Sequence, residues 1–339
     1  MKDVLARVAA GHRLSESEAE GAFQTIMSGE ATPAQIGALL MALRVRGETV
    51  AEITGAARAM RGKALPLDAP QGAIDTCGTG GDGAGTYNIS TAAAFVVAAC
   101  GVPVAKHGNR ASSSKSGSAD VLAALGVDLD ADMALVRECL WTSNLGFLMA
   151  PRHHNAMRHV AGVRAELGTR TIFNLLGPLS NPAGTRLQIV GVFADHWVRP
   201  VAEVLGRLGA ERAWVVHGSD GLDELTTCGP SLVAELRDAT VEMFEITPED
   251  AGLPRARPDD LKGGDAARNA GALRALLDGA PGPYRDIVLL NSAAALMVAG
   301  KTDHIRSAVA MAAQAIDSGR ALGVLNRMVA ITNRKTAIP

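Results

Sequence analysis

Helical periodicity dominates the first 65 residues of the chain. Apolar side chains recur with helical spacing at Ile36, Leu39, Leu40 and Leu43. Three capping boxes, each a Ser or Thr followed three positions later by Glu or Gln, mark helix starts at Ser15-x-x-Glu18, Thr32-Pro33-x-Gln35 and Thr49-x-x-Glu52. Because this region carries no catalytic motif, we predict a small all-helical domain over residues 1–65 that serves packing or dimerisation.

A different pattern follows the linker of residues 64–72, which is rich in Pro and Gly. Short apolar runs alternate with helical segments, which is typical of a mostly parallel sheet flanked by helices. The runs interpreted as strands are residues 73–76, 102–105, 187–193, 213–216 and 287–290. The predicted fold class is therefore α/β, with a larger domain over residues 72–339. Residues 151–185 show little strand character.

The composition of the chain limits the kinds of core it can build and of partner it can bind. The chain is 47% hydrophobic but only 3% aromatic, so small aliphatic side chains must build its core. The net charge of −2 argues against nucleic acid or an anionic membrane as a partner. The longest nearly apolar run, residues 91–105, is too short to span a bilayer. Four dispersed cysteines and the lack of a signal-peptide pattern favour a cytoplasmic location.

Residues 75–120 concentrate groups that bind anions. Four of the six residues from 78 to 83 are glycine, which lets backbone N–H groups turn toward a ligand. Residues 88–91 place an amide and hydroxyls at an expected helix start, where N–H groups and the dipole favour an anion. Lys106, Arg110 and Lys115 follow among serines. Together these features indicate a polyphosphate ligand.

Two familiar glycine motifs do not fit this stretch. Gly78-x-Gly80-x-x-Gly83 matches a dinucleotide fingerprint, but a loop intervenes before the helix and no acidic residue occurs between Asp82 and Asp120. A Walker A loop needs glycines at fixed positions before Lys-Ser/Thr, and neither Gly62-Lys63 nor Lys115-Ser116 has them. The ligand is therefore not expected to bind in either of those ways.

An acidic pair, Asp223-Glu224, follows the expected strand at residues 213–216 and a turn. Adjacent carboxylates repel one another unless they are solvated or bridged by a cation, and Mg²⁺ prefers carboxylates together with phosphate oxygens. These residues alone are compatible with two interpretations, a solvated acidic turn and a magnesium site.

The motifs taken together resemble a known family. Residues 78–82, 88–91 and 106–110, with residues 170–182 and 220–224, closely resemble the motifs of the anthranilate phosphoribosyltransferases, which join anthranilate to phosphoribosyl pyrophosphate (PRPP) in tryptophan biosynthesis. The resemblance covers nearly the whole chain in order. It implies a nucleoside-phosphorylase-like phosphoribosyltransferase fold, part of residues 151–185 packed on the small domain, and a homodimer through the N-terminal helices.

The same resemblance implies a set of site residues. PRPP would contact Gly78, Gly81, Asp82, Thr86, Asn88, Ile89, Ser90, Thr91, Lys106, Ser114 and Ser118. Anthranilate would contact Gly78, His107, Asn109, Arg164, Gly177 and Pro178, with Arg164 on its carboxylate. Two Mg²⁺ ions per subunit are implied, bound by Ser90, Asp223 and Glu224. Asn155 stands where the family pattern has a proline, next to the expected substrate entrance.

Two other functions remain as competitors. A nucleoside phosphorylase of the same fold would use phosphate and a pyrimidine nucleoside, but the motif of residues 106–110 and the acidic pair argue against it. A non-catalytic relative that binds nucleic acid would be expected to lose the glycine loop or the acidic pair and to show basic stripes. The chain keeps both motifs and has a net charge of −2, so we expect a transferase that needs no covalent nucleophile.

Overall fold

The computed structural model describes residues 1–111 and 115–334. Its N-terminal part is a bundle of four helices, α1 (Lys2–Ala9), α2 (Glu16–Met27), α3 (Pro33–Arg46) and α4 (Val50–Gly62). All three predicted capping boxes form, at the starts of α2, α3 and α4. The side chain of each Ser or Thr accepts a hydrogen bond from the backbone three residues on, which satisfies a donor that the helix leaves unpaired.

A seven-stranded sheet forms the centre of the rest of the chain. Its strands are β1 (Ile74–Thr76), β2 (Val104–Gly108), β3 (Leu145–Met149), β4 (Leu187–Gly191), β5 (Arg212–Gly218), β6 (Ser231–Arg237) and β7 (Thr240–Ile246). Their order is β3-β2-β1-β4-β5-β6-β7, and pairing is parallel from β3 to β5 and antiparallel beyond β5. The chain runs outward from β1 to β3 on one side and from β4 to β7 on the other. In such sheets ligands bind where the order reverses, at the carboxyl ends of β1 and β4.

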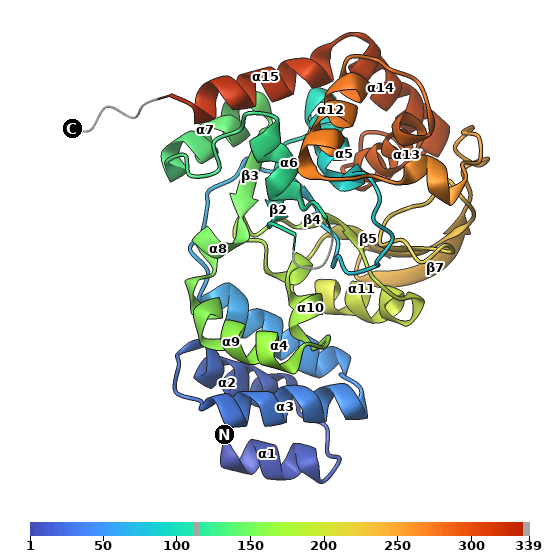
Figure 1. The fold of residues 1–339 in the computed structure, drawn as a ribbon. Coiled ribbons are helices and arrows are strands. Elements are labelled where there is room, and N and C mark those ends of the chain that lie inside the picture. The colour runs from blue at the N-terminus through green and yellow to red at the C-terminus, as the bar shows by residue number, and fades with distance from the viewer. Residues whose placement is uncertain (112–114, 335–339) are drawn as a thin grey trace.

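Successive side chains along each strand point to opposite faces of the sheet, and each face belongs to its own apolar cluster. Ile189 and Trp214 join one cluster, whereas Val190 and Val215 join the other. The first face is covered by α5 (Ile89–Ala99), α12 (Ala266–Leu277), α13 (Pro283–Val298), α14 (Ile305–Asp317) and α15 (Arg320–Thr332). These helices lie above the sheet in Figure 1.

The second face is covered by α11 (Val198–Arg207) and α10 (Phe173–Leu176), which also pack on α4. Helix α9 (Arg158–Leu167) packs against α2 and α3, and its Val160 and Val163 belong to the apolar cluster of the bundle. The bundle and α9 therefore form the lower part of the molecule in Figure 1. The remaining short elements are α6 (Ser118–Ala124), α7 (Met133–Ser143), α8 (Ala150–His153), η1 (Asn155–Met157), η2 (Pro178–Ser180), η3 (Asp195–Trp197) and η4 (Pro258–Leu261).

The predicted class, a helical domain plus a mostly parallel sheet flanked by helices, is confirmed, but one predicted strand is wrong. Residues 287–290 lie within α13, which is packed against α5, α14 and the sheet. A helix buried on nearly all sides shows no amphipathic period, so a short window of it cannot be told from a buried strand.

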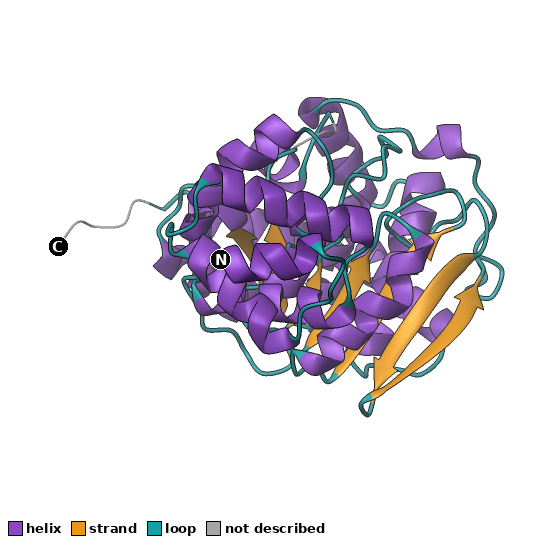
Figure 2. Ribbon diagram, turned by 90° about the horizontal axis from the view of Figure 1, so that it is seen from below, coloured by secondary structure: helices purple, strands orange, loops and turns teal. Residues whose placement is uncertain are grey.

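The β6–β7 hairpin was not anticipated from the sequence. Its strands are joined by Asp238 and Ala239, both in the left-handed region with φ of 50° and 61°. A two-residue turn of this kind matches the twist of antiparallel strands. Figure 2 shows the hairpin at the edge of the sheet. None of the described helices has the length and apolar character needed to cross a bilayer.

Candidate active site

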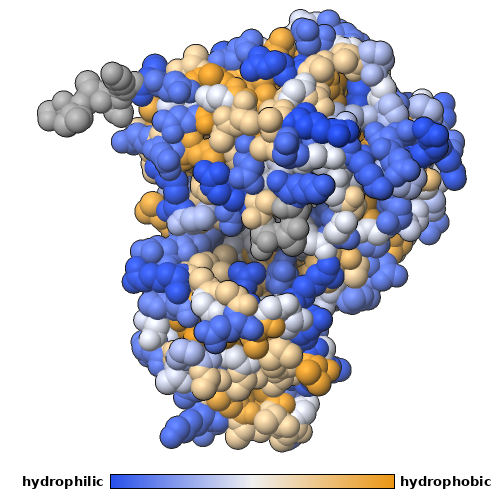
Figure 3. Space-filling view, in the orientation of Figure 1, coloured by the Kyte–Doolittle hydropathy of each residue, from blue (hydrophilic) through white to orange (hydrophobic). Residues whose placement is uncertain are grey.

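A cavity of about 1460 Å³ lies between α9 and the carboxyl edge of the sheet. Figure 3 shows the molecule hollowed at this level, between the sheet with its upper helices and the bundle below. Among the described residues that line it, five are cationic and one is acidic: Lys115, Arg158, Arg164, Arg170 and Lys262 against Asp82. In a chain with a net charge of −2, this concentration of positive charge indicates anionic ligands.

The structure brings most of the sequence-predicted residues to this region. Six of them line the cavity: Gly81, Asp82, His107, Asn109, Arg164 and Gly177. Three others, Gly78, Ser90 and Glu224, line a water-sized pocket under the glycine loop. Asn155 also lines the cavity. Ser114 lies outside the described residues.

The remaining predicted residues lie in the elements next to the cavity. Thr86 pairs with Lys262 in an isolated bridge, and Asn88 is the residue before α5. Ile89, Ser90 and Thr91 form the first turn of that helix, Lys106 is in β2, Ser118 begins α6 and Pro178 begins η2.

The glycine loop and the acidic pair are in direct contact. The Gly80 N–H donates to Asp223 Oδ2 at 2.6 Å, and the Ser90 N–H donates to Glu224 Oε1 at 3.2 Å. A Cβ atom at Gly78 would lie 2.5 Å from Asp223 Oδ2, so a side chain there would clash with the carboxylate. The geometric condition for a shared diphosphate and metal site is therefore met.

Electrostatics at the acidic pair favour a bound cation. Burial, then Glu224 and Asp82, raise the pKa of Asp223 well above its usual range. Burial raises the pKa of Glu224 to about 7, although the nearby Lys106 charge opposes the shift. Carboxylates held close together provide the hard oxygen donors that Mg²⁺ prefers. The donor set therefore fits this ion.

Lys106 lies beneath the loop rather than in the cavity. Its ammonium donates to the Thr76 carbonyl oxygen at 2.6 Å, and the side chain is almost fully buried. Burial raises the pKa of the neighbouring Asp75 to about 6, against the effect of Lys106. Lys106 thus places a positive charge near two carboxylates, those of the buried Asp75 and the half-buried Glu224.

A group formed by Asp75, Cys77 and His107 has metal-ligand spacing, but its atoms are engaged within the protein. Asp75 accepts from the His107 N–H at 3.1 Å and from the Asn181 amide at 2.6 Å. Burial raises the pKa of the Cys77 thiol, so it does not supply a thiolate at neutral pH. We therefore interpret this group as structural.

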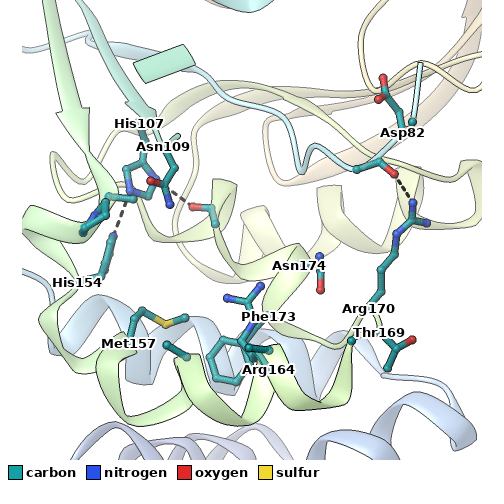
Figure 4. A pocket seen from close by; sticks show the side chains of 18 of the residues that line it. Asp82, His107, Asn109, His154, Met157, Arg164, Thr169, Arg170, Phe173 and Asn174 are labelled. Carbon is teal, nitrogen blue, oxygen red and sulfur yellow. Dashed lines mark hydrogen bonds between the residues drawn. The ribbon is translucent and has the colours of Figure 1, made fainter. Parts of the chain in front are cut away.

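Two buried histidines form one wall of the cavity. The Nε2 atoms of His107 and His154 are 3.2 Å apart, and His107 Nδ1 is hydrogen-bonded to the Gly177 carbonyl oxygen at 3.1 Å. Burial, with the neighbouring His154, lowers the pKa of His107 to about 3. Burial, with His153, lowers that of His154 to about 4. Both rings are therefore neutral near pH 7 and present hydrogen-bonding groups without charge (Figure 4).

The two arginines of the α9–α10 region differ in their partners. Arg170 donates to the Gly81 carbonyl oxygen, and its guanidinium carbon lies 4.3 Å from the centre of the Phe193 ring. Arg164 stacks over Phe173 at 5.5 Å, and no described residue accepts a hydrogen bond from its guanidinium. Figure 4 shows Arg170 reaching to the glycine loop near Asp82. Arg164 is therefore available to an anion in the cavity.

Sequence reasoning missed one segment of the site. The backbone of residues 261–263 runs beside that of residues 85–87, with the Tyr87 N–H donating to Leu261 O and the Gly263 N–H donating to Gly85 O, both at 3.0 Å. Lys262 from this segment lines the cavity, and the side chain of Asn269 reaches Asn88. The only local signal was Gly263-Gly264-Asp265, a glycine pair before a helix start.

Comparison with known proteins defines the class first. Residues 2–64 match the helical bundle domain of the glycosyl transferase family, and residues 70–322 match its a/b domain. Together these matches cover most of the chain and define a glycosyl transferase of the bundle-plus-a/b class.

Individual relatives narrow the class. An anthranilate phosphoribosyltransferase from Paramagnetospirillum magneticum is 70% identical over 334 residues, which is 98% of this chain and 96% of the relative. The crystal structure of the enzyme from Thermus thermophilus matches with a TM-score of 0.93 and 48% identity, over 98% of this chain and 100% of the other. The Saccharomyces cerevisiae enzyme in complex with PRPP and Mg matches with a TM-score of 0.87 and 28% identity, over 97% of each chain. The chain belongs to the anthranilate phosphoribosyltransferase family, which confirms the resemblance seen in its sequence.

Proposed function

We propose that this chain transfers the phosphoribosyl group of PRPP to the amine of anthranilate, giving N-(5-phosphoribosyl)anthranilate and pyrophosphate in tryptophan biosynthesis. The observation that carries the proposal is the contact of the glycine loop with Asp223 and Glu224 at the edge of a cationic cleft. The identity of the family and the yeast complex with PRPP and Mg support it.

The PRPP half of the site would lie at the carboxyl ends of β1 and β4. Backbone N–H groups of the loop and of the first turn of α5, with the nearby hydroxyls and amide, offer donors to phosphate oxygens. The residues assigned to PRPP are Gly78, Gly81, Asp82, Thr86, Asn88, Ile89, Ser90, Thr91, Lys106, Ser114 and Ser118. Of these, Lys106 would act through its charge from beneath the loop, since its ammonium donates to the Thr76 carbonyl oxygen. Asp82 is an acceptor, so a ribose hydroxyl is its more suitable partner.

Ser90, Asp223 and Glu224 would hold Mg²⁺, which when bound neutralises charge on the departing diphosphate. Two ions per subunit are proposed, one with Ser90 and Glu224 and the other with Asp223 and Glu224. A calorimetric titration of Mg²⁺ in the presence of PRPP tests this number. A stoichiometry of one ion per subunit would contradict the proposal of two.

The anthranilate half would lie against α9 and the histidine wall. Arg164 lines the cavity and donates no hydrogen bond to another described residue, which suits a two-pronged contact with a carboxylate. His107 and Asn109 would lie near the ring and amine, with Gly78, Gly177 and Pro178 as the surrounding wall. Both histidines remain neutral, so they do not compete with Arg164 for the carboxylate.

Catalysis would rest on positioning and electrostatic stabilisation. The ribose carbon becomes oxocarbenium-like as the diphosphate departs, and the amine attacks from the opposite face. The N–H donors of the loop stabilise charge that grows on the departing oxygens. No covalent protein nucleophile is needed.

The organisation of the molecule leads to three smaller proposals. Residues 1–65 with part of 151–185 would form one domain and residues 72–339 the other, with the cleft between them. The bundle would form a homodimer, since Val45 of α3 is 82% exposed and apolar side chains gather at the lower end of Figure 3. A cytoplasmic location remains the expectation from the dispersed cysteines.

The decisive experiment is loss of anthranilate fluorescence on mixing the purified chain with PRPP and Mg²⁺. Turnover that requires all three components is expected. No consumption of anthranilate, combined with phosphorolysis of thymidine, would favour the nucleoside phosphorylase alternative. A shift of nucleic acid in a gel without turnover would favour the binding relative.

A further inference from the structure

Asn269 is a buried amide outside the predicted site that is hydrogen-bonded to it. It lies in the first turns of α12 and is 1% exposed. Its Nδ2 donates to Asn88 Oδ1 at 2.9 Å, and its Oδ1 accepts from the Gly264 N–H at 2.7 Å. The two asparagines are 181 positions apart in the sequence. Only the tertiary fold brings them together.

The Asn88 side chain does not cap α5, although Asn88 occupies the N-cap position. Its Oδ1 accepts from Asn269, and its Nδ2 donates to the Ser116 carbonyl oxygen at 3.3 Å. The Asn88 carbonyl oxygen also accepts from the Tyr284 hydroxyl at 3.2 Å. Asn88 therefore links the loop before α5 to the segment before α6 and to helices α12 and α13.

The orientation of this chain of amides is set by a backbone group. The Gly264 N–H can only donate, so it requires an oxygen of Asn269, which then presents its NH₂ group to Asn88. Asn88 must in turn direct Oδ1 toward Asn269 and Nδ2 toward Ser116. One backbone donor thus decides which way both amides point.

Close packing holds the segment that carries this donor. A Cβ atom at Gly263 would lie 2.7 Å from the Thr86 carbonyl oxygen and 2.8 Å from Asn269 Oδ1, so a side chain at this position would clash with the loop. With the two backbone hydrogen bonds between residues 261–263 and 85–87, the segment is fixed against the loop before α5.

We infer that Asn269 is a positioning residue for PRPP: it sets the orientation of the Asn88 amide and holds the loop before α5 in the conformation that receives the diphosphate. This inference rests on the proposed function, in which Asn88 contacts PRPP. Asn269 itself does not line the cavity, and its link to the proposed PRPP site is the hydrogen bond to Asn88.

The Asn269→Asp variant tests the inference, because the two side chains have nearly the same shape. A carboxylate still accepts from the Gly264 N–H, but it offers Asn88 an acceptor in place of a donor. We expect KM for PRPP and the Kd of PRPP with Mg²⁺, measured by calorimetry without anthranilate, to rise roughly tenfold, the loss of about one hydrogen bond. KM for anthranilate should stay near its wild-type value.

Asn144→Asp is the matched control. Asn144 is a half-buried amide that ends α7 and donates to the Ala98 carbonyl oxygen, outside the cavity, so its replacement should leave both KM values unchanged. In a double-mutant cycle, adding Asn269→Asp to Asn88→Ala should cause no further rise in KM for PRPP, since Asn269 acts through Asn88.

Asn269→Ser provides a second reading if the buried carboxylate prevents folding. Its shorter side chain cannot span from Gly264 to Asn88, and the same selective rise in KM for PRPP is expected. Unchanged KM for PRPP in a folded variant would overturn the inference while leaving the proposed function intact. Failure of both variants to fold would also overturn it, because Asn269 would then determine the fold. A wild-type chain without turnover would instead refute the proposed function.

Discussion

Carboxylates have opposite surroundings in the helical bundle and beside the glycine loop of the cleft. In the bundle, Glu52 is fully buried and every contact is favourable: it accepts from the Leu14 N–H at 2.8 Å, from Thr49 and from the Arg46 guanidinium at 2.5 Å. At the cleft, Asp223 and Glu224 lie against each other and near Asp82, and their pKa values are raised.

The carboxylate of the bundle helps to hold the fold, whereas the carboxylates of the cleft are those expected to take part in the reaction. Removing one partner of a buried ion pair is costly, because the other charge is left buried and uncompensated. Repulsion between the charged Asp223 and Glu224 carboxylates lowers stability, and a bound cation would offset it. Replacing a carboxylate is therefore expected to have different effects in the bundle and in the cleft, and variants in each region test this difference.

The largest expected effect is on turnover. Combining Asp223→Asn with Glu224→Gln should lower kcat/KM by roughly a thousandfold, because losing one oriented group that stabilises charge typically costs about a hundred- to a thousandfold and two groups are lost here. The anthranilate fluorescence assay with PRPP and Mg²⁺ measures it. Glu235→Gln, in a sheet ion pair with Arg212, is the control with unchanged activity. Retained Mg²⁺-dependent turnover in the double variant would show that the acidic pair does not bind the metal ion.

The next effect is on the stability of the bundle. Glu52→Ala should lower the free energy of unfolding by about 3–5 kcal/mol, since it leaves Arg46 and two backbone N–H groups without their acceptor. Urea unfolding measures this, and KM for both substrates should not change. Glu203→Ala breaks only an exposed pair with Arg199 and should cost at most about 0.5 kcal/mol. Equal losses in the two variants would contradict the contrast between the regions.

A smaller effect is the pH dependence of the metal-free protein. The pKa of Glu224 is about 7 in the folded chain against 4.5 for a free side chain, so the folded state keeps a proton that the unfolded state releases. Its contribution to stability is fully present below about pH 4.5 and is lost as pH rises through about 7. Asp223 shifts in the same direction.

The variant carrying Asp223→Asn and Glu224→Gln should lack most of this loss. At pH 8 without metal it should be more stable than the wild type by about 1–3 kcal/mol, as measured by urea unfolding. A smaller slope should remain from Asp75, whose pKa is raised to about 6. A variant less stable than the wild type at pH 8 would show that the pair is already compensated without a cation.

The smallest effect is on one substrate alone. Arg164→Ala should raise KM for anthranilate roughly tenfold and leave KM for PRPP nearly unchanged, since one charge-assisted contact is lost. Steady-state kinetics with each substrate varied in turn measures the split. For Arg164→Lys, which keeps the charge but not the forked geometry, KM for anthranilate should lie between the values for the wild type and for Arg164→Ala. Equal changes in both KM values would count against the assigned role.

The parts of the fold that follow from local sequence were predicted well. Each capping box satisfies backbone donors within four residues, so the starts of α2, α3 and α4 could be predicted without tertiary information. Where the surroundings decide, prediction failed. Residues 287–290 are apolar in any case, and only their packing against α5, α14 and the sheet makes them part of α13.

The candidate site divides in the same way. The glycine loop and the pair Asp223-Glu224 could be recognised because each is a short motif with its own chemistry. Asn269 could not, because nothing next to it in the chain marks a buried amide whose partner is 181 residues away. The contacts of Arg164 and Arg170 came only from the structure, in which Arg170 donates to the Gly81 carbonyl oxygen and Arg164 stacks over Phe173.

Sequence alone thus determined the helix starts of the bundle, the α/β class and the groups available to bind a diphosphate and a cation, since these depend on neighbours within a few residues. The tertiary structure alone decided that Asp223 lies against the loop, that five cationic side chains of the described residues line the cleft, and how the Asn88 amide is oriented. Those features depend on distances between segments far apart in the chain, which only the packing of helices on the sheet determines.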